Sequence, residues 1–348
     1  MILTLYGARH LTEPEKTCWI ITGGDTGTEN QCIGLAEALG LRAEIKRLKL
    51  KTPWRQLSPW FRLGFGRALA KDGARLDPPW PDLLIASGRK SIAAALHVKK
   101  KSGGRTFVVQ VQDPRFSPRS FDLIVAPQHD PARGGNVIVT TGATHRVTDG
   151  KIKSDMEKFK DALEKLPHPR VAVLIGGQSK SHRMTRAVTE RLAAQLLALV
   201  KEKNVSLMIT ASRRTGEENA KFLRATLKGD NIYFWNGGEN GQGGDNPYFA
   251  LLGYADHIVV TEDSVSMVSE ALSTGKPVHI AALEHAPGGP FEKIGGGTPR
   301  RHDIFHKMLQ AQGYTRPFTG ALETWSYAPL RDTLDVANEI RTLLHMKE

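Results

Sequence analysis

One pattern occurs twice in this chain of 348 residues: a short apolar run ends in two glycines and leads into a helical pattern. The first copy is the run at residues 17–24 with the helical pattern at 29–39, and the second is the run at 171–177 with the pattern at about 184–201. A strand, a glycine turn and a helix are the parts of a βαβ unit, whose strands form a parallel sheet. The restart predicts two α/β domains, as expected for a chain too long for one hydrophobic core.

Further strands and helices alternate in both halves of the sequence. We expect strands at residues 42–48, 83–86, 106–111, 123–126, 206–210, 232–235, 257–261 and 277–281. We expect helices at residues 91–101, 154–166, 217–227, 266–274 and 330–346. Alternation of this kind predicts an α/β protein with two doubly wound, Rossmann-like domains that face a cleft.

Prolines separate the two copies of the pattern. Pro167 and Pro169 follow the helix expected at 154–166, and the second apolar run begins directly after them. We therefore expect an N-terminal domain at 1–168, a C-terminal domain at 169–322 and a C-terminal helical segment at 323–348.

Charge and composition restrict the partners and the compartment. The chain has 48 Lys and Arg against 36 Asp and Glu, a net charge of +12, which favours anionic partners. Nucleic acid is not the expected partner, because no recognition motif accompanies the charge. Two cysteines provide no disulfide framework. Without signal-peptide features or a long apolar run, we expect a cytoplasmic location, with peripheral attachment to a membrane left open.

A basic and aromatic stretch lies at residues 53–73. Its aromatic and basic side chains are Trp54, Trp60, Phe61, Phe65, Arg55, Arg62 and Arg67. This composition suits contact with a membrane surface or a lipid-like acceptor. It also suits a helix packed on the N-terminal sheet.

Ligands of open α/β sheets bind beyond the carboxyl ends of the strands, so the loops there hold the candidate residues. In the first loop of the second domain, glycine N–H groups and a lysine could bind an anion; the candidates are Gly176, Gly177, Ser179 and Lys180. In the next, Arg213 and Arg214 follow a strand and are either phosphate ligands or a solvated turn.

A third loop opens a helix with hydroxyl groups. Its candidates for a diphosphate are Ser264, Val265 and Ser266, while plain N-capping by Ser264 is the alternative. Glu270 follows in the helix and, if buried, is expected to meet hydroxyl groups or a cation. The segment 288–305, with glycines, Arg300, Arg301 and His302, is either an active-site edge or a surface loop.

In the first domain, Asp25, His129 and Asp130 are candidates for a general base near an acceptor hydroxyl. His129 and Asp130 could equally shape a turn before Pro131. We expect no metal site, because His129, Asp130 and His145 are not closely spaced ligands and the chain has no cysteine cluster. The first loop also lacks the G-x-G-x-x-G pattern of a dinucleotide site.

Residues 264–278 read S-x-S-x-x-S-E-A-L-x-x-G-K-P-V. This stretch resembles the donor site of GT-B glycosyltransferases such as the peptidoglycan N-acetylglucosaminyltransferase. The resemblance implies that the serine turn meets the pyrophosphate of a nucleotide-diphosphate sugar and that Glu270 meets its ribose. It also implies that the C-terminal helix returns to the first domain, and that no cofactor is needed besides the nucleotide-sugar substrate.

Over nearly its whole length the chain resembles the mitochondrial-fission "elongated mitochondria" family. The residues that carry this likeness are 29–31, 127–130, 210–215, 246–248 and 261–271. The family's role in plants implies recruitment of a partner to the outer mitochondrial membrane. The first loop departs from the family pattern, because it reads Gly23-Gly24-Asp25-Thr26-Gly27 where an Asp-Gly start is expected.

Together these observations lead to one hypothesis and two alternatives. The hypothesis is a GT-B-like glycosyltransferase that moves a sugar from a nucleotide-diphosphate sugar to an acceptor, with a lipid-linked or membrane-surface acceptor as one option. The alternatives are a nucleotide-sugar epimerase and a non-catalytic adaptor that keeps the fold. The nucleotide base, the sugar, the acceptor and the oligomeric state stay open.

Overall fold

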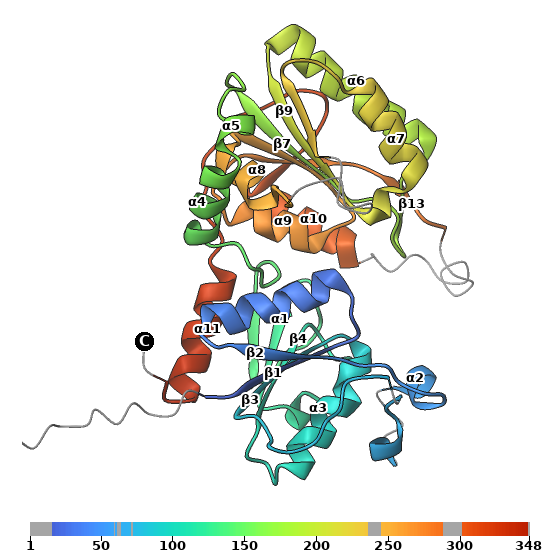
Figure 1. Cartoon of the computed structure of the whole chain (residues 1–348), viewed down its shortest axis with the longest axis vertical. Coiled ribbons are helices and arrows are strands. Elements are labelled where there is room, and N and C mark those ends of the chain that lie inside the picture. Colours follow the sequence, from blue (N-terminus) through green and yellow to red (C-terminus); the bar gives the residue numbers. More distant parts are fainter. Residues whose placement is uncertain are drawn as a thin grey trace, which may run out of the picture.

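The structure is a computed structural model that describes residues 16–58, 60, 64–70, 72–235, 245–287 and 301–346. Two six-stranded parallel sheets form its framework. Figure 1 shows them as two units, one above the other, with the N-terminal half of the chain below. The predicted fold class is therefore confirmed.

The first sheet has the strand order β2-β1-β3-β4-β5-β6. Its strands are β1 (Cys18–Thr22), β2 (Ala43–Arg47), β3 (Leu83–Ser87), β4 (Phe107–Val111), β5 (Leu123–Pro127) and β6 (Val137–Thr140). Helices α1 (Thr26–Ala38) and α3 (Arg89–Lys101) connect neighbouring strands. The sequence analysis missed β6, because residues 128–136 join it to β5 without a helix that would mark another βαβ unit.

The second sheet has the order β10-β9-β7-β11-β12-β14. Its strands are β7 (Arg170–Ile175), β9 (Ser206–Ala211), β10 (Ile232–Trp235), β11 (His257–Thr261), β12 (Val278–Ala281) and β14 (Thr315–Pro317). Its helices include α6 (Arg186–Lys203), α7 (Glu217–Thr226), α9 (Val265–Leu272) and α10 (Arg301–Ala311). Two short strands, β8 (His182–Arg183) and β13 (Glu284–His285), pair antiparallel beside it.

The helix expected at 154–166 packs on the second sheet's side. It is observed as α4 (Asp149–Lys158) and α5 (Lys160–Leu163), and it begins earlier because the Thr148 side chain accepts the N–H of Lys151 as an N-cap. Helix α4 contacts α8 (Tyr248–Tyr254), and Leu163 lies in the core that includes β7 and β11. We therefore propose a domain boundary before Thr148 rather than at 168.

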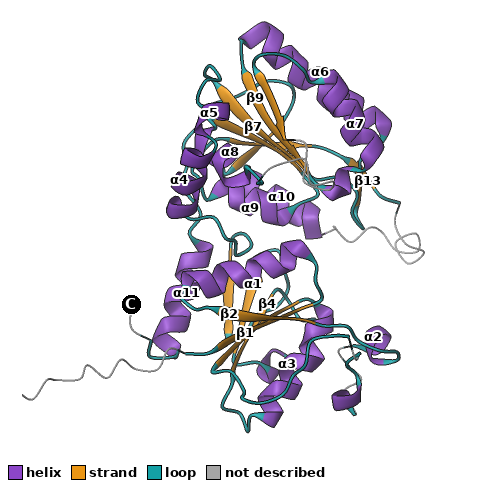
Figure 2. Cartoon of the chain, in the orientation of Figure 1, coloured by secondary structure: helices purple, strands orange, loops and turns teal. Residues whose placement is uncertain are grey.

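The C-terminal helix α11 (Asp332–Leu343) packs against α1 of the first unit. Val336, Ala337 and Ile340 are buried in the same core as Leu35. Figure 2 shows the two helices side by side below the second unit. The chain thus crosses between the units twice, once before α4 and once before α11.

The basic and aromatic stretch contains a short helix, α2 (Trp54–Leu57), and a 3-10 turn that starts at Phe65. Phe65 is 4% exposed and belongs to the core of the first unit, whereas Trp60 is 65% exposed. Phe61 and Arg62 lie outside the described residues. Across the described part of the chain, no helix combines the length and apolarity needed to span a bilayer.

Candidate functional site

The candidate site lies where chain order reverses in both sheets. That reversal falls between β1 and β3 in the first sheet and between β7 and β11 in the second. Ligands of open α/β sheets bind at such switch points, beyond the carboxyl ends of the strands. Helix α1 follows β1 and helix α9 follows β11, so each switch point carries a helix start. Both starts line one cleft of about 1800 Å³.

The first two turns of α1 contact the first turn of α9 across this cleft. The side-chain amide of Gln31 donates to Oγ of Ser266 over 3.1 Å and accepts from Nε2 of Gln112 over 3.0 Å. A Cβ added to Gly27 would lie 3.6 Å from the same Ser266 Oγ. Helix N-termini carry partial positive charge, so two of them facing one space favour an anion there.

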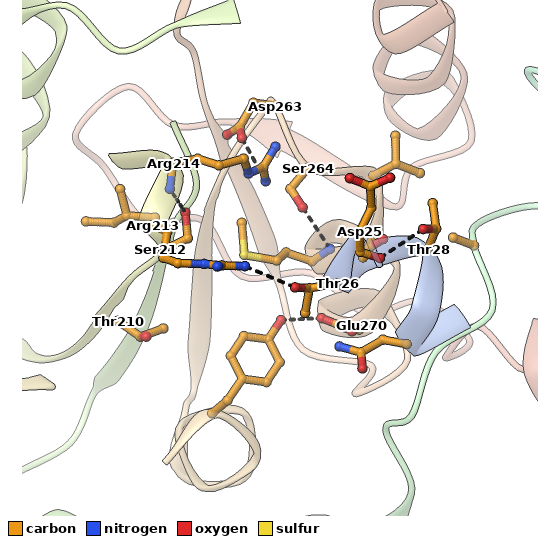
Figure 3. A pocket seen from close by; sticks show the side chains of 18 of the residues that line it. Asp25, Thr26, Thr28, Thr210, Ser212, Arg213, Arg214, Asp263, Ser264 and Glu270 are labelled. Atoms are coloured by element: carbon orange, nitrogen blue, oxygen red, sulfur yellow. Dashed lines mark hydrogen bonds and ion pairs between the residues drawn. The ribbon is translucent and has the colours of Figure 1, made fainter. Parts of the chain in front are cut away.

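Two arginines reach the cleft from the turn after β9, as Figure 3 shows. Arg213 donates to Oγ1 of Thr26 over 3.2 Å, and so crosses to the first turn of α1. Arg214 forms an ion pair with Asp263 at 3.0 Å, and the Asp263 side chain is fully buried. Burial raises the pKa of Asp263 above its ordinary value, and the guanidinium of Arg214 opposes that rise. Arg214 therefore serves first as the counterion of a buried carboxylate.

The glycine turn after β7 does not present its N–H groups to the cleft. Gly176 N–H donates to Oγ1 of Thr261 over 2.7 Å, and Gly177 N–H donates to Oδ2 of Asp263 over 3.0 Å. A Cβ on Gly176 would lie 2.3 Å from the Asp263 carboxylate. The N–H groups expected to bind a ligand anion are thus used internally, by a protein hydroxyl and a protein carboxylate.

The other two candidates of that loop also point elsewhere. Oγ of Ser179 accepts the N–H of His182 over 3.0 Å and closes a local turn, and Lys180 is exposed. Among the described residues that line the cleft, none comes from this loop, and Ile175 at the end of β7 is the nearest in sequence before it. The sequence analysis grouped these residues with the site because glycine next to lysine suits phosphate, but hydrogen bonds to distant residues decide where the turn faces.

The start of α9 holds its three candidates at the cleft. Ser264 is the N-cap, because its Oγ accepts the N–H of Met267 over 3.3 Å, and this was the alternative interpretation of the residue. Val265 and Ser266 follow in the first turn and line the cleft. Further along the helix, Ser269 donates to Val265 O and accepts the N–H of Ala143, a second link to the first unit.

Glu270 is a buried carboxyl group that borders the cleft. It accepts a hydrogen bond from the hydroxyl of Tyr248 on α8. Burial raises the pKa of Glu270 to about 7, although the bond from Tyr248 acts in the opposite direction. The sequence analysis did not assign Tyr248 to the site, although residues 246–248 were among those that carried the family resemblance.

The three candidate bases of the first unit differ in their surroundings. Asp130 is committed to an ion pair with Arg301 at 2.6 Å, and the same guanidinium reaches Asp113 at 3.0 Å. His129 packs edge-on against Phe305, and burial lowers its pKa to about 4. Asp25 is the exposed N-cap residue of α1 and lines the cleft.

Arg301, at the start of α10, joins the two units across the cleft. The sequence analysis noted it only as part of a basic helix start after a glycine stretch. That stretch and Arg300 lie outside the described residues.

Two curated proteins are similar to this chain over almost its whole length. One is the mitochondrial fission protein ELM1 of Arabidopsis thaliana, 29% identical over 92% of this chain and 90% of that protein. The other is the uncharacterized protein RP120 of Rickettsia prowazekii, 26% identical over 95% of this chain and 99% of that protein.

Among solved structures, the UDP-GlcNAc 2-epimerase of Neisseria meningitidis is similar with a TM-score of 0.52 and 14% identity, over 95% of this chain and 100% of the other. At this identity the likeness shows the fold alone, and it confirms the GT-B-like arrangement. The mitochondrial fission ELM1 family matches residues 26–344 of the sequence. The match spans nearly the whole chain, so the chain belongs to the mitochondrial fission ELM1 family.

Proposed function

We propose that the cleft binds a nucleoside-diphosphate sugar and that the protein transfers the sugar to a hydroxyl group of an acceptor. One observation carries this proposal: Gln31 in the second turn of α1 bonds Ser266 in the first turn of α9, and Arg213 reaches from the second unit to Thr26 at the start of α1. Two helix N-termini and a guanidinium converge there. A diphosphate is the ligand that such a convergence suits best.

Glu270 supplies the contact for the sugar part of the nucleotide. It lies one turn further along α9 than Ser266, and Tyr248 fixes its carboxyl group. With a pKa of about 7, the group is part protonated and part ionised at neutral pH. It can therefore both donate to and accept from ribose hydroxyl groups, which themselves donate and accept.

For the transfer step, we assign the general base to Asp25. Asp130 is held by Arg301, and burial disfavours the imidazolium that His129 would become after taking a proton. The Asp25 carboxylate would take the proton of the acceptor hydroxyl while the oxygen of that hydroxyl attacks the anomeric carbon of the sugar. The bond from that carbon to the diphosphate oxygen breaks, and the helix starts with Arg213 stabilise the negative charge of the leaving diphosphate.

Calorimetry with uridine, UDP and UDP-GlcNAc tests the binding step, and UDP-GlcNAc is a reasonable first probe because the structurally similar epimerase binds it. We expect UDP to bind more tightly than uridine. Other nucleoside diphosphates complete the panel, and a chain that binds none of them would refute the proposal. Asp25→Asn should keep binding and abolish transfer.

Product analysis separates the proposed reaction from its alternatives. UDP release together with a glycosylated acceptor supports transfer, whereas conversion of the donor to its 2-epimer would identify an epimerase. Tight binding without any turnover across acceptor mixtures would favour the adaptor, for which the fold keeps a ligand site without chemistry.

A further inference from the structure

Three side chains with metal-binding chemistry gather beside β8 and β13. His182 and His285 are direct cross-strand partners in this two-stranded sheet, and their ring centroids are 5.4 Å apart. Asp303 joins them from the first turn of α10. One ring nitrogen of each histidine and one carboxylate oxygen of Asp303 all lie within 4.8 Å of one another. Strand pairing and a helix start thus bring together residues that are far apart in the sequence.

The buried histidine of this group has a nitrogen that makes no hydrogen bond to the described residues. His182 is 1% exposed, and among the described residues its Nε2 has no hydrogen-bond partner. Nδ1 of the same ring lies 3.1 Å from Oγ of Ser181. If Nδ1 carries the proton and donates it to Ser181, the lone pair of the ring is on Nε2. A buried polar atom without a hydrogen-bond partner needs an explanation, and beside a second histidine and a carboxylate a bound ion is the one that fits.

We propose that His182, His285 and Asp303 bind a divalent transition-metal ion, with zinc as the best match. Two imidazole nitrogens and a carboxylate oxygen form a set that suits zinc, whereas magnesium and calcium prefer oxygen ligands alone. Glu262 is available as a further ligand, because its Oε1 lies 3.7 Å from Nε2 of His182. Zinc bonds of about 2.0–2.2 Å keep ligand atoms roughly 3.5 Å apart. The longest distances between the ligand atoms of this group therefore have to shorten by about 1 Å when the ion binds.

We expect that contraction to fall on the two more exposed side chains. The side chain of His285 is 53% exposed and that of Asp303 is 31% exposed, and their Nδ1 and Oδ1 atoms are 4.0 Å apart. His182, by contrast, is fixed by Ser181 and by its place in the sheet. The oxygen of Ser181 acts as an outer partner that orients the ligand ring, a common arrangement for metal-bound histidines.

The metal ion would bind at the start of α10, the segment whose Arg301 reaches across the cleft. Asp303 lies two residues after Arg301, whose guanidinium forms the ion pairs with Asp113 and Asp130 of the first unit. Binding of the ion would fix the start of α10 to β13 and β8, and so hold Arg301 in place. This inference is independent of nucleotide binding, and neither result decides the other.

Zinc titration of the untagged protein, after dialysis against a chelator, tests the site. Competition with a chromophoric chelator should show one tight equivalent per chain, and cobalt should give the visible absorption of a low-symmetry site. His285→Ala and Asp303→Asn each remove a partly exposed ligand, so the fold should survive and circular dichroism will check it. We expect each to weaken zinc binding by more than the roughly 10–100-fold typical for loss of an outer partner, and Ser181→Ala to fall within that range.

His168→Ala is the matched control. His168 also pairs with a carboxylate, Asp256, at 2.6 Å, and its side chain is similarly exposed at 62%, but it lies outside the group. It should bind zinc as the wild type does. Absence of a tight equivalent in the wild type, unchanged affinity in both ligand variants, or an equal loss in His168→Ala would each overturn the proposal.

Discussion

The side-chain amide of Gln31 bonds to Ser266 across the interdomain cleft, over 3.1 Å. Gln31 is 4% exposed, and its other amide atom accepts from Gln112. The two helix starts are therefore held together by side chains from three separate segments, rather than by a covalent connection nearby. A ligand that enters between them meets donors from both units, which links binding in this cleft to the relative position of the two sheets.

The two arginines of the β9 turn should respond differently to replacement by alanine. Arg213 is exposed and its side chain bonds only Thr26 among the described residues, so Arg213→Ala should leave stability unchanged. It should weaken nucleoside diphosphate binding by about 10–100-fold, the size of one charge-assisted contact, and leave nucleoside binding unchanged. Calorimetry with UDP and uridine measures both effects. An equal loss for uridine would contradict a phosphate contact.

Arg214→Ala should instead destabilise the fold, because it leaves the buried carboxylate of Asp263 without its counterion. We expect a loss of about 1–3 kcal/mol in the free energy of unfolding, measured with denaturant. Asp263→Asn in the same chain removes the buried charge and should recover part of that loss. No recovery would mean that the ion pair contributes little.

Glu270→Gln tests the proposed ribose contact. The amide keeps the shape of the side chain, and its oxygen can still accept the hydrogen bond from the Tyr248 hydroxyl, but it cannot ionise. The affinities for uridine and for UDP should fall by the same factor, about tenfold for one hydrogen bond, because the ribose is common to both. A loss confined to UDP would place Glu270 at the diphosphate instead.

The same substitution should change the pH dependence of stability. Burial raises the folded pKa of Glu270 from 4.5 to about 7, so the folded state binds this proton more tightly than the unfolded state. The wild type therefore loses stability as pH rises from 4.5 to 7, and Glu270→Gln does not. The free energy of unfolding of the variant, relative to that of the wild type, should be about 2 kcal/mol higher at pH 8 than at pH 5, measured by denaturant unfolding at both values. An equal difference at the two pH values would contradict the raised pKa.

Arg301→Ala should weaken the contact between the units. It leaves Asp113 and Asp130 facing each other without a cation, and their side chains are only 7% and 5% exposed. We expect the free energy of unfolding, measured with denaturant, to fall by about 2 kcal/mol or more. This is less than for a fully buried ion pair, because Arg301 is 33% exposed. Adding Asp113→Asn and Asp130→Asn should restore most of it. Failure of this triple variant to recover would point to lost packing of α10.

Two glycines of helix α1 offer a matched pair. A Cβ on Gly34 would lie 2.1 Å from the backbone oxygen of His145, whereas a Cβ on Gly27 meets only Ser266 Oγ at 3.6 Å. Gly27→Ala should be neutral or stabilising by up to about 1 kcal/mol, as expected in a helix. Gly34→Ala should be strongly destabilising, because the backbone of residues 145–146 has to move. Thermal unfolding of both variants measures the contrast, and a stable Gly34→Ala would show that this loop yields easily.

The sequence by itself determined the two parallel sheets and the loops that border the cleft. Strand, glycine turn and helix recur with local periodicities, and the carboxyl ends of parallel strands lie at one edge of a sheet, so Arg213, Ser266 and Glu270 could be placed there without coordinates. Where the periodicity was missing, as between β5 and β6, a strand was overlooked. The N-cap that starts α4 at Thr148 was overlooked in the same way.

The tertiary structure decided which of those groups can bind a ligand and which are used by other parts of the protein. Gly176 and Gly177 look like anion ligands in sequence, but β11 brings Thr261 and Asp263 to their N–H groups. The expectation of no metal site rested on the spacing of His129, Asp130 and His145 along the chain. It did not consider His182, His285 and Asp303, which the pairing of β8 with β13 and the start of α10 bring within 4.8 Å. Local sequence sets backbone conformation, but burial and hydrogen-bond partners depend on segments far apart in the chain that meet only when the chain is folded.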